Sequence, residues 1–532
     1  MAMNERIYLF DTTLRDGAQT QGVDFSVTDK CRVIEMLDGL GLDYIEAGWP
    51  GANPVDDQVF GDPPSLTQSR LVAFGMTKRA GRSADNDPVI APLIAAKSPN
   101  LCFVGKSWDF HVTDALGVSL EDNLEMIGDT VAYAAARKAE VMYDAEHFFD
   151  GYKANPDYAL GCLKAAYDNG ARWVVLCDTN GGTLPHEVQR IVEKVLEQIP
   201  GDRLGVHFHN DTDNAVANSL TAIRAGARQI QGTINGLGER CGNASLTSLI
   251  PTLVLKTDFE CGIQAEKLVQ LTALSDELDR MLGLSGNRHR PYTGANAFAH
   301  KGGLHASAII KDPTTYEHVA PEVIGNKRKV PISSQSGRAN INFVLAQIGF
   351  GRELSNDECS RVLQALKENE ESARLSYDGA DASFELFVHR TIGGLPTFFE
   401  IDRFRVIDER RHNSQGQVVT EAIGMVQLMI EGRSVMEASG GSGPVDALNK
   451  ALGKALAATF PQLADMSLSD YSVRIIDSDK ATEATTRVLI ESRDDQGRVW
   501  TCVGVSENVI DASFQALEDA IVWKLMKEAQ EL

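Results

Sequence analysis

The amino-acid sequence predicts an α/β protein whose first half is a closed parallel barrel. Short apolar runs recur there about every thirty residues, and a helical pattern follows each run. The eight runs are 7–14, 42–49, 70–77, 100–107, 140–148, 172–180, 203–210 and 228–236. Strand–helix alternation is typical of parallel sheets, and eight units predict closure into a (β/α)8 TIM barrel. A doubly wound open sheet is the alternative, although no GxGxxG follows the first run to support it.

Helix start and stop signals lie between these runs. The capping-box pattern at 26–29 predicts a helix that Gly39 or Gly41 can end. Pro185 opens a second helix, whose apolar residues share one face. A third helix is predicted over 214–226. These signals place helices where a barrel needs its outer layer.

Composition excludes several classes of function. The chain has 532 residues, a formal net charge of −23, 43% apolar and 23% charged residues. This balance argues against nucleic acid or an anionic membrane as the main partner. The eight cysteines show no CxxC spacing and no run reaches the length of a membrane span, so we expect reduced thiols and a cytoplasmic location. The N-terminal residues enter a strand at once, so we expect no signal peptide.

Ionisable side chains gather where the predicted strands end. Active sites of such barrels lie at the carboxyl ends of the strands. The residues at these ends are Arg15, Asp16, Glu46, Lys106, Glu146, His147, Asp178, Thr179, the run 207–211 and the run 238–240. A barrel with only a structural role would have no reason to concentrate charge at one end.

Three of these positions, together with Asn243, predict a metal site. His207 and His209 are two apart on one strand, so their side chains share a face. Closure brings Asp16, after the first strand, and Asn243, after the eighth, to the same point. Mixed nitrogen and oxygen ligands suit Zn²⁺, Mn²⁺, Co²⁺ or Fe²⁺, with Mg²⁺ as a further candidate. The alternative is a pair of satisfied polar histidines in the core.

Arg15 stands beside the predicted ligand Asp16. A metal polarises a carbonyl oxygen, and a neighbouring guanidinium stabilises the oxyanion that develops. The alternative for Arg15 is an ion pair with a neighbouring carboxylate, which is compatible with that role.

Four motifs in order carry a resemblance to a known family. They are DTTLRDGAQ at 11–19, HFHND at 207–211, GLGERCGNA at 236–244 and HKGGLHASA at 300–308. Together they resemble the metal-dependent acyl-CoA:2-oxoacid Claisen condensation enzymes, which include the α-isopropylmalate, homocitrate and citramalate synthases. Within that family the stretch 144–156 is most similar to the citramalate synthases. The resemblance extends over the whole chain.

The resemblance implies a reaction and the residues that perform it. Acetyl-CoA would condense with pyruvate and water to give (R)-citramalate and CoA, in isoleucine biosynthesis. The positions that match the family's sites are Asp16, His207, His209 and Asn243 as metal ligands, Arg15 as the catalytic and substrate-binding arginine, Glu146 and Thr179 in the keto-acid pocket, and His305 with Tyr316 acting from a partner subunit. His300 competes with His305 for the catalytic assignment.

The C-terminal half predicts two further domains. A helical linker subdomain over 266–375 follows a catalytic domain over 1–265, and an α+β domain occupies 380–532. That last domain contains an internal repeat, because 437–452 and 502–517 share Asp-Ala-x-x-x-Ala-Leu after strand-like runs. We expect two strands and one helix in each copy. The domain resembles the family's allosteric domain, which implies a homodimer and isoleucine as effector.

Other functions stay open on the sequence alone. A sister enzyme would use 2-oxoisovalerate or 2-oxoglutarate, and a lyase would run the cleavage. Two histidines and one carboxylate also suit a non-haem Fe(II) oxygenase. A metal-binding sensor protein would bind metal without turnover. The oxygenase leaves Arg15, the 300–308 motif and the C-terminal repeat unexplained.

Overall fold

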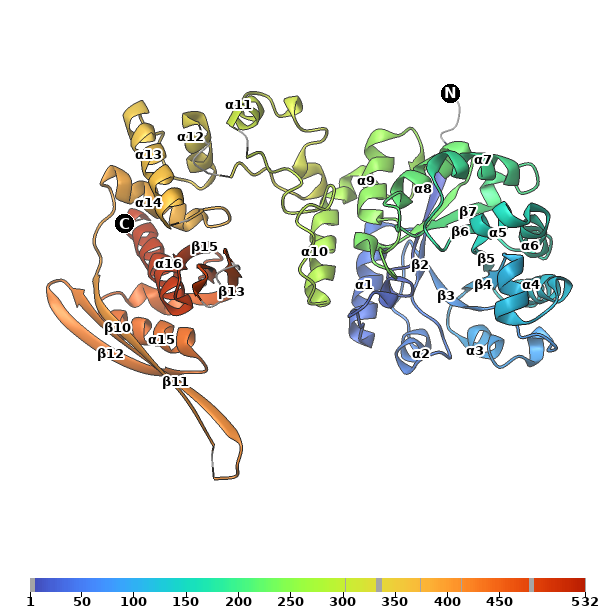
Figure 1. Ribbon diagram of the computed structural model, residues 1–532, viewed down its shortest axis with the longest axis horizontal. Helices are drawn as coiled ribbons and strands as arrows, with labels where there is room; N and C mark the ends of the chain where they lie inside the picture. The colour runs from blue at the N-terminus through green and yellow to red at the C-terminus, as the bar shows by residue number, and fades with distance from the viewer. Residues whose placement is uncertain are drawn as a thin grey trace. The chain divides into compact units, whose positions relative to one another are not determined.

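The computed structural model describes residues 5–301, 303–331, 337–373, 375–412, 414–477 and 483–531. The chain forms two compact units (Figure 1). One unit consists of Met1–Phe298 with Val319–Lys327, and the other of Ala299–His318 with Arg328–Leu532.

The first unit is built on a closed barrel of eight parallel strands. The strands are β1 (Arg6–Asp11), β2 (Tyr44–Glu46), β3 (Arg70–Met76), β4 (Asn100–Lys106), β5 (Glu140–Glu146), β6 (Trp173–Asp178), β7 (Leu204–Phe208) and β8 (Gln229–Gly232). Each strand pairs in parallel with the next, and β1 pairs with both β8 and β2, which closes the barrel. The predicted TIM barrel is confirmed. A short strand β9 (Glu260–Cys261) also pairs with the start of β1, and it is too short to leave an apolar run.

Helices connect the strands and form the outer layer. They are α1 (Val27–Leu40), α2 (Pro54–Gly61), α3 (Ile90–Ala95), α4 (Leu120–Ala135), α5 (Phe148–Ala154), α6 (Pro156–Asp168), α7 (Pro185–Val195), α8 (Ala215–Ala225), α9 (Leu246–Lys256) and α10 (Leu271–Met281). Ser26 and Asp29 form the reciprocal capping box at the start of α1, and Gly41 ends that helix at φ 103°. Local sequence therefore sets these boundaries.

Two kinds of side chain fill the inside of the barrel. A cluster of large apolar residues, which includes Phe10, Tyr44, Met142 and Trp173, packs within it. Buried polar residues also occur on the strands, and His207 on β7 is one of them. The apolar cluster gives the polar residues a rigid, low-dielectric support.

The second unit begins with helices and continues as two repeated α+β units. The helices are α11 (Gly303–Lys311), α12 (Arg338–Gln347), α13 (Asn356–Ala373) and α14 (Asp381–Ile392). The repeats are β10 (Glu400–His412), β11 (Val418–Ile430), β12 (Arg433–Gly441) and α15 (Pro444–Ala457), then β13 (Ser467–Ile475), β14 (Thr486–Arg493), β15 (Val499–Ser506) and α16 (Val509–Glu531). Each repeat is an antiparallel three-stranded sheet followed by a helix.

The expectation of two strands per repeat is wrong by one strand. The third strand of each copy coincides with the start of the shared motif, at 437–441 within β12 and 502–506 within β15. Glycine and serine in these stretches predict turns, whereas pairing with the middle strand holds them extended. Tertiary pairing here overrides local propensity.

Among the described residues, no helix is both long and apolar enough to cross a membrane. All eight cysteines are free thiols. The cytoplasmic location stays a prediction.

Candidate metal centre and active site

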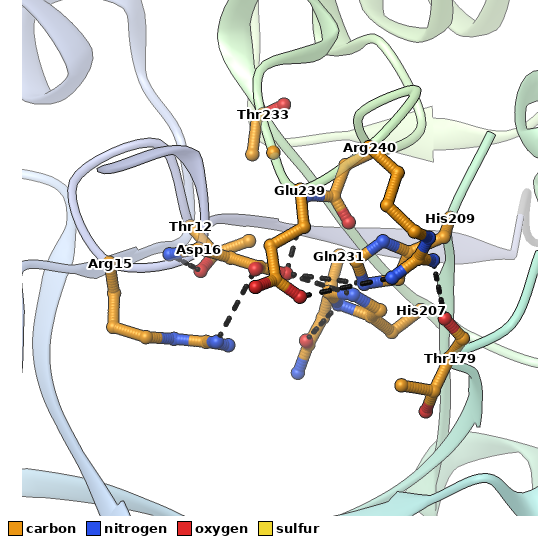
Figure 2. A network of polar contacts seen from close by, with 12 residues as sticks. Thr12, Arg15, Asp16, Thr179, His207, His209, Gln231, Thr233, Glu239 and Arg240 are labelled. Atoms are coloured by element: carbon orange, nitrogen blue, oxygen red, sulfur yellow. Dashed lines mark hydrogen bonds and ion pairs between the residues drawn. The ribbon is translucent and has the colours of Figure 1, made fainter. Parts of the chain in front are cut away.

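Three buried side chains converge at the carboxyl end of the barrel. The Nε2 atoms of His207 and His209 lie 3.2 and 3.6 Å from Oδ2 of Asp16. In Figure 2 Arg15 and the two histidines approach Asp16 from opposite sides. One ligand atom of each of the three residues lies within 4.8 Å of the others. The structure thus brings together three of the four residues that the sequence predicts as ligands.

Strand geometry accounts for this convergence. His207 lies in β7, which ends at Phe208, and His209 follows directly, so the two imidazoles point to the same side. Asp16 lies in the turn after β1, where its backbone N–H donates to Oγ1 of Thr12 at 3.3 Å. Because β1 closes the barrel against β8, a residue at the start of the chain reaches one near position 207.

Asn243 completes the set from the loop after β8. Its Nδ2 donates to Oδ2 of Asp16 at 3.2 Å and to the carbonyl oxygen of Leu237 at 3.0 Å. The loop needs glycine at 238, where φ is 151° and an added Cβ would lie 2.2 Å from Nδ2 of Asn243. This close approach explains why the motif GLGERCGNA carries glycine at that position.

The electrostatics of the cluster favour an ionised carboxylate. Burial works against the charge of Asp16, but Arg15 and His207 outweigh it and hold the pKa of Asp16 well below its usual range. Burial also opposes protonation of His207, yet its hydrogen bond to Asp16 raises the pKa of His207. Burial and the neighbouring His207 lower the pKa of His209 to about 4. One imidazole and one carboxylate are therefore ready ligands at neutral pH.

The donor set fits a divalent metal. Among the described residues, Oδ1 of Asn243 is buried and has no hydrogen-bond partner. Buried polar atoms are rarely left unpaired, and an ion is one of the usual reasons. Two imidazole nitrogens, a carboxylate and an amide oxygen are ligands that Zn²⁺, Mn²⁺, Co²⁺ and Fe²⁺ accept.

Arg15 is held rigidly beside this cluster. Its Nε donates to Oε2 of Glu46 at 2.6 Å, and its Nη1 lies 3.7 Å from Oδ1 of Asp16. The guanidinium carbon lies 3.9 Å from the ring centre of Phe74. Burial opposes the charge, but Glu46 and Asp16 raise the pKa of Arg15 above its ordinary value. Arg15 therefore forms the expected ion pair and still presents a fixed positive charge at the barrel mouth.

The other predicted pocket residues lie at the same end of the barrel. Glu146 ends β5 and forms an ion pair with Lys106, which ends β4. Oγ1 of Thr179 accepts a hydrogen bond from the backbone N–H of His147 at 2.9 Å, and the carbonyl oxygen of Thr179 accepts one from Arg240. These contacts order the loops after β5 and β6.

His305 and Tyr316 belong to the second unit. Their rings stack with centroids 4.2 Å apart, and both side chains are exposed. His300 is instead held inside its unit, because Nε2 lies 3.3 Å from Oε1 of Glu317 and Arg328 clamps the same carboxylate at 2.6 and 2.7 Å. The two histidines of the 300–308 motif therefore differ. His300 is held by an ion pair within its unit, whereas the side chain of His305 is exposed.

The chain matches three family models in succession. Residues 6–274 match the HMGL-like family, 292–374 match the homocitrate synthase post-HMGL domain-like family, and 378–525 match the LeuA allosteric (dimerisation) domain. It is 48% identical to an (R)-citramalate synthase of Aquifex aeolicus over 99% of both chains, and 48% identical to one of Geobacter sulfurreducens over 98% of both. The chain belongs to the (R)-citramalate synthase family. A 2-isopropylmalate synthase of Carboxydothermus hydrogenoformans is 30% identical over 97% of both chains.

This result confirms the resemblance drawn from the four motifs. HMGL-like enzymes use a divalent metal, which agrees with the cluster of Asp16, His207 and His209. The chain is also more similar to the (R)-citramalate synthase of Aquifex aeolicus than to the 2-isopropylmalate synthase, as the stretch 144–156 predicts.

Proposed function

We propose that the chain is a metal-dependent (R)-citramalate synthase that joins acetyl-CoA to pyruvate. One observation carries the proposal: a buried guanidinium, Arg15, is fixed beside the Asp16, His207 and His209 cluster at the barrel mouth. Condensation needs an electrophilic keto carbon and a stabilised oxyanion, and this pairing can supply both.

The reaction balances as follows. A base removes a proton from the methyl group of acetyl-CoA, and the resulting carbon bonds to the keto carbon of pyruvate. The keto oxygen takes up a proton and becomes a hydroxyl. Water then cleaves the thioester, which releases the CoA thiol and leaves citramalate with a second carboxylate.

Asp16, His207, His209 and Asn243 would hold the metal. When bound, a divalent cation supplies Lewis acidity to the keto oxygen and carboxylate of a 2-oxoacid. The choice among Zn²⁺, Mn²⁺, Mg²⁺, Co²⁺ and Fe²⁺ stays open, since each accepts oxygen or nitrogen ligands.

Arg15 would stabilise the negative charge that grows on the keto oxygen. The bond to Glu46 and the aromatic face of Phe74 restrain the guanidinium before substrate arrives, so little reorganisation is needed during reaction. Thr179 and Glu146 would line the keto-acid pocket at the ends of β6 and β5, and Glu146 would also act as a catalytic residue.

His305 is the proposed base, with Tyr316 beside it, acting from a partner subunit. The exposed, stacked pair in the second unit supports this role, whereas the ion pair of His300 with Glu317 supports a structural one. We accordingly propose a catalytic domain over 1–265, a linker subdomain over 266–375 that contributes to the partner's site, and a regulatory domain over 380–532.

The regulatory domain supports a homodimer. Its match to the LeuA dimerisation domain agrees with apolar side chains left exposed on the sheets. Ile407 and Ile423 are cross-strand partners that are each about half exposed, as is Ile475 on β13. Substituting Ile423→Glu should shift the mass in light scattering from dimer to monomer. An unchanged mass after that substitution and Ile475→Glu would place the interface elsewhere.

We further propose isoleucine as the effector of this domain. Isoleucine should bind in calorimetry and lower the rate of CoA release, with leucine as the comparison. Absence of both binding and inhibition would remove isoleucine and leave the catalytic proposal intact.

The test of the catalytic proposal is thiol release from acetyl-CoA with pyruvate, 2-oxobutyrate, 2-oxoisovalerate and 2-oxoglutarate, each with and without a chelator. We expect release that depends on pyruvate and stops with the chelator. A preference for another 2-oxoacid would support the condensation reaction but show that pyruvate is not the substrate. No release with any of them after metal is restored would overturn the condensation reaction.

A further inference from the structure

Gln231 links the proposed metal ligand His207 to a carboxylate inside the barrel. It lies on β8, paired in register with His207 on the neighbouring strand β7. Its Oε1 lies 3.0 Å from Nδ1 of His207, and its Nε2 donates to Oδ1 of Asp144 at 3.0 Å. Gln231 is completely buried, and Figure 2 shows it beside His207.

Asp144 determines which way the Gln231 amide faces. An ionised carboxylate only accepts hydrogen bonds, so the amide must turn its NH₂ group toward Asp144. Burial and the charge of Glu46 raise the pKa of Asp144 to about 6, which leaves it ionised at pH 8. The amide oxygen is then left to face His207.

An oxygen at this position determines the state of the imidazole. Oε1 of Gln231 can only accept, so Nδ1 of His207 must carry a proton. When His207 is neutral, the lone pair is therefore on Nε2, the atom that faces Asp16. A histidine that binds a metal through Nε2 needs this tautomer.

We propose that Gln231, oriented by Asp144, is a positioning residue that holds His207 in the metal-binding tautomer. The inference rests on the proposed metal site and extends it to residues on β8 and β5 that are outside the proposed ligand set. Outer partners of this kind typically change metal affinity by about 10–100-fold.

The same strand offers a matched control. Gln229 is the same residue type, is also completely buried, and points to the same side of β8 because it lies two residues earlier. Its Nε2 lies 3.8 Å from Sδ of Met142, and its Oε1 has no hydrogen-bond partner among the described residues. Substituting Gln229→Leu therefore changes barrel packing without touching His207.

The experiment measures the dissociation constant for Mn²⁺ or Zn²⁺ at pH 8 by competition with a fluorescent chelator. Gln231→Leu should weaken binding by about 10–100-fold, whereas Gln229→Leu should leave it close to the unsubstituted protein. The double variant Gln231→Glu with Asp144→Asn exchanges amide and carboxylate. It should restore most of the affinity, because the new carboxylate at position 231 accepts from His207 and the new amide at position 144 can donate to that carboxylate.

Two outcomes overturn different statements. If the unsubstituted protein binds metal and Gln231→Leu binds it equally well, or if the exchanged pair is as weak as Gln231→Leu, the positioning role is wrong and the metal site stands. If the unsubstituted protein binds no metal, the proposed metal site is wrong, and the proposed role of Gln231 is wrong as well. Should Gln231→Leu not fold, Asp144→Asn alone should still weaken binding, since the amide is then free to turn.

Discussion

Two buried charge clusters, one in each unit, differ in how completely their polar groups are paired. Lys524 on α16 has no exposed surface, and its ammonium lies 3.2, 2.9 and 2.8 Å from carboxylates of Asp465, Asp494 and Glu528. An ammonium has three hydrogens, so Lys524 is saturated. Among the described residues, buried atoms of Glu46, His209 and Asn243 at the barrel mouth lack a hydrogen-bond partner, whereas around Lys524 one carboxylate oxygen, Oδ1 of Asp465, lacks one.

The difference distinguishes a structural cluster from a binding one. A buried ammonium whose three hydrogens are all bonded has no donor left for a ligand, so it affects the stability of the fold. A cluster that places two imidazole nitrogens beside the carboxylate of Asp16 has capacity for a cation. Substitutions in the cluster around Asp16 should therefore alter metal affinity and turnover. Substitutions in the cluster around Lys524 should alter the stability of the second unit.

The largest effect is expected from Asp16→Asn. This change keeps the shape of the side chain and removes the charge that two imidazoles face. Metal affinity should fall by more than the roughly 100-fold upper limit for outer partners, and CoA release should fall to background. Chelator competition and thiol assays measure both. Asp494→Asn is the matched control from the other cluster, and equal metal affinities of the two variants would abolish the distinction.

Arg15→Gln should lower kcat by about 10²–10³, the usual cost of losing one oxyanion-stabilising donor. The affinity for metal should stay the same or tighten slightly, because a positive charge 3.7 Å from Asp16 is removed. Steady-state kinetics with saturating metal, together with chelator competition, measure the two quantities. A large loss of metal affinity would make Arg15 part of the metal site rather than of the reaction.

Lys524→Met should destabilise the second unit by about 3–5 kcal/mol, since it removes a buried cation and leaves Asp494 and Glu528 paired with Arg498 alone. Denaturant unfolding, followed by the fluorescence of the stacked Trp500 and Trp523, measures the free energy. The affinity of the barrel for metal should not change. A stable variant with weakened metal binding would reverse the assignment of the two clusters.

The smallest effect is a difference in acid stability. Burial would raise the pKa of Asp494, but hydrogen bonds from Lys524 and Arg498 outweigh it and lower the pKa to about 2. A carboxyl group with a depressed folded-state pKa stabilises the protein above its unfolded-state pKa and loses that contribution as pH falls toward 2. The advantage of the unsubstituted protein over Asp494→Asn should therefore be present at pH 5 and shrink toward pH 2 in urea unfolding. A constant gap would mean that Asp494 does not carry this charge.

Sequence patterns could predict the barrel because each strand and helix leaves a local signal. The apolar runs contain all eight barrel strands apart from Arg6 at the start of β1, and the capping box at Ser26 begins α1 as predicted. His207 and His209 could be paired from their spacing, and closure of the ring brought in Asp16 and Asn243. The structure confirms that these four residues lie close together, whereas their roles in metal binding stay a prediction.

The supporting residues could not be predicted in the same way. Gln231 contacts Asp144 across 87 positions of sequence, and no motif spacing links strands that meet inside a barrel. The one available signal was the pair Gln229 and Gln231, which put two amides on one face of a strand that should be apolar. The third strand of each C-terminal repeat was missed because Gly440 and Gly441 in β12 and Gly504 in β15 favour turns until a partner strand holds them extended.

The most direct test of the central claim joins metal content to chemistry in one sample. Protein stripped with a chelator is titrated with Mn²⁺ in the presence of pyruvate and acetyl-CoA, and bound metal and released CoA are measured together. We expect no CoA release without metal and a rise that saturates at about one ion per chain, as a single site requires. Undiminished CoA release from metal-free protein would contradict it.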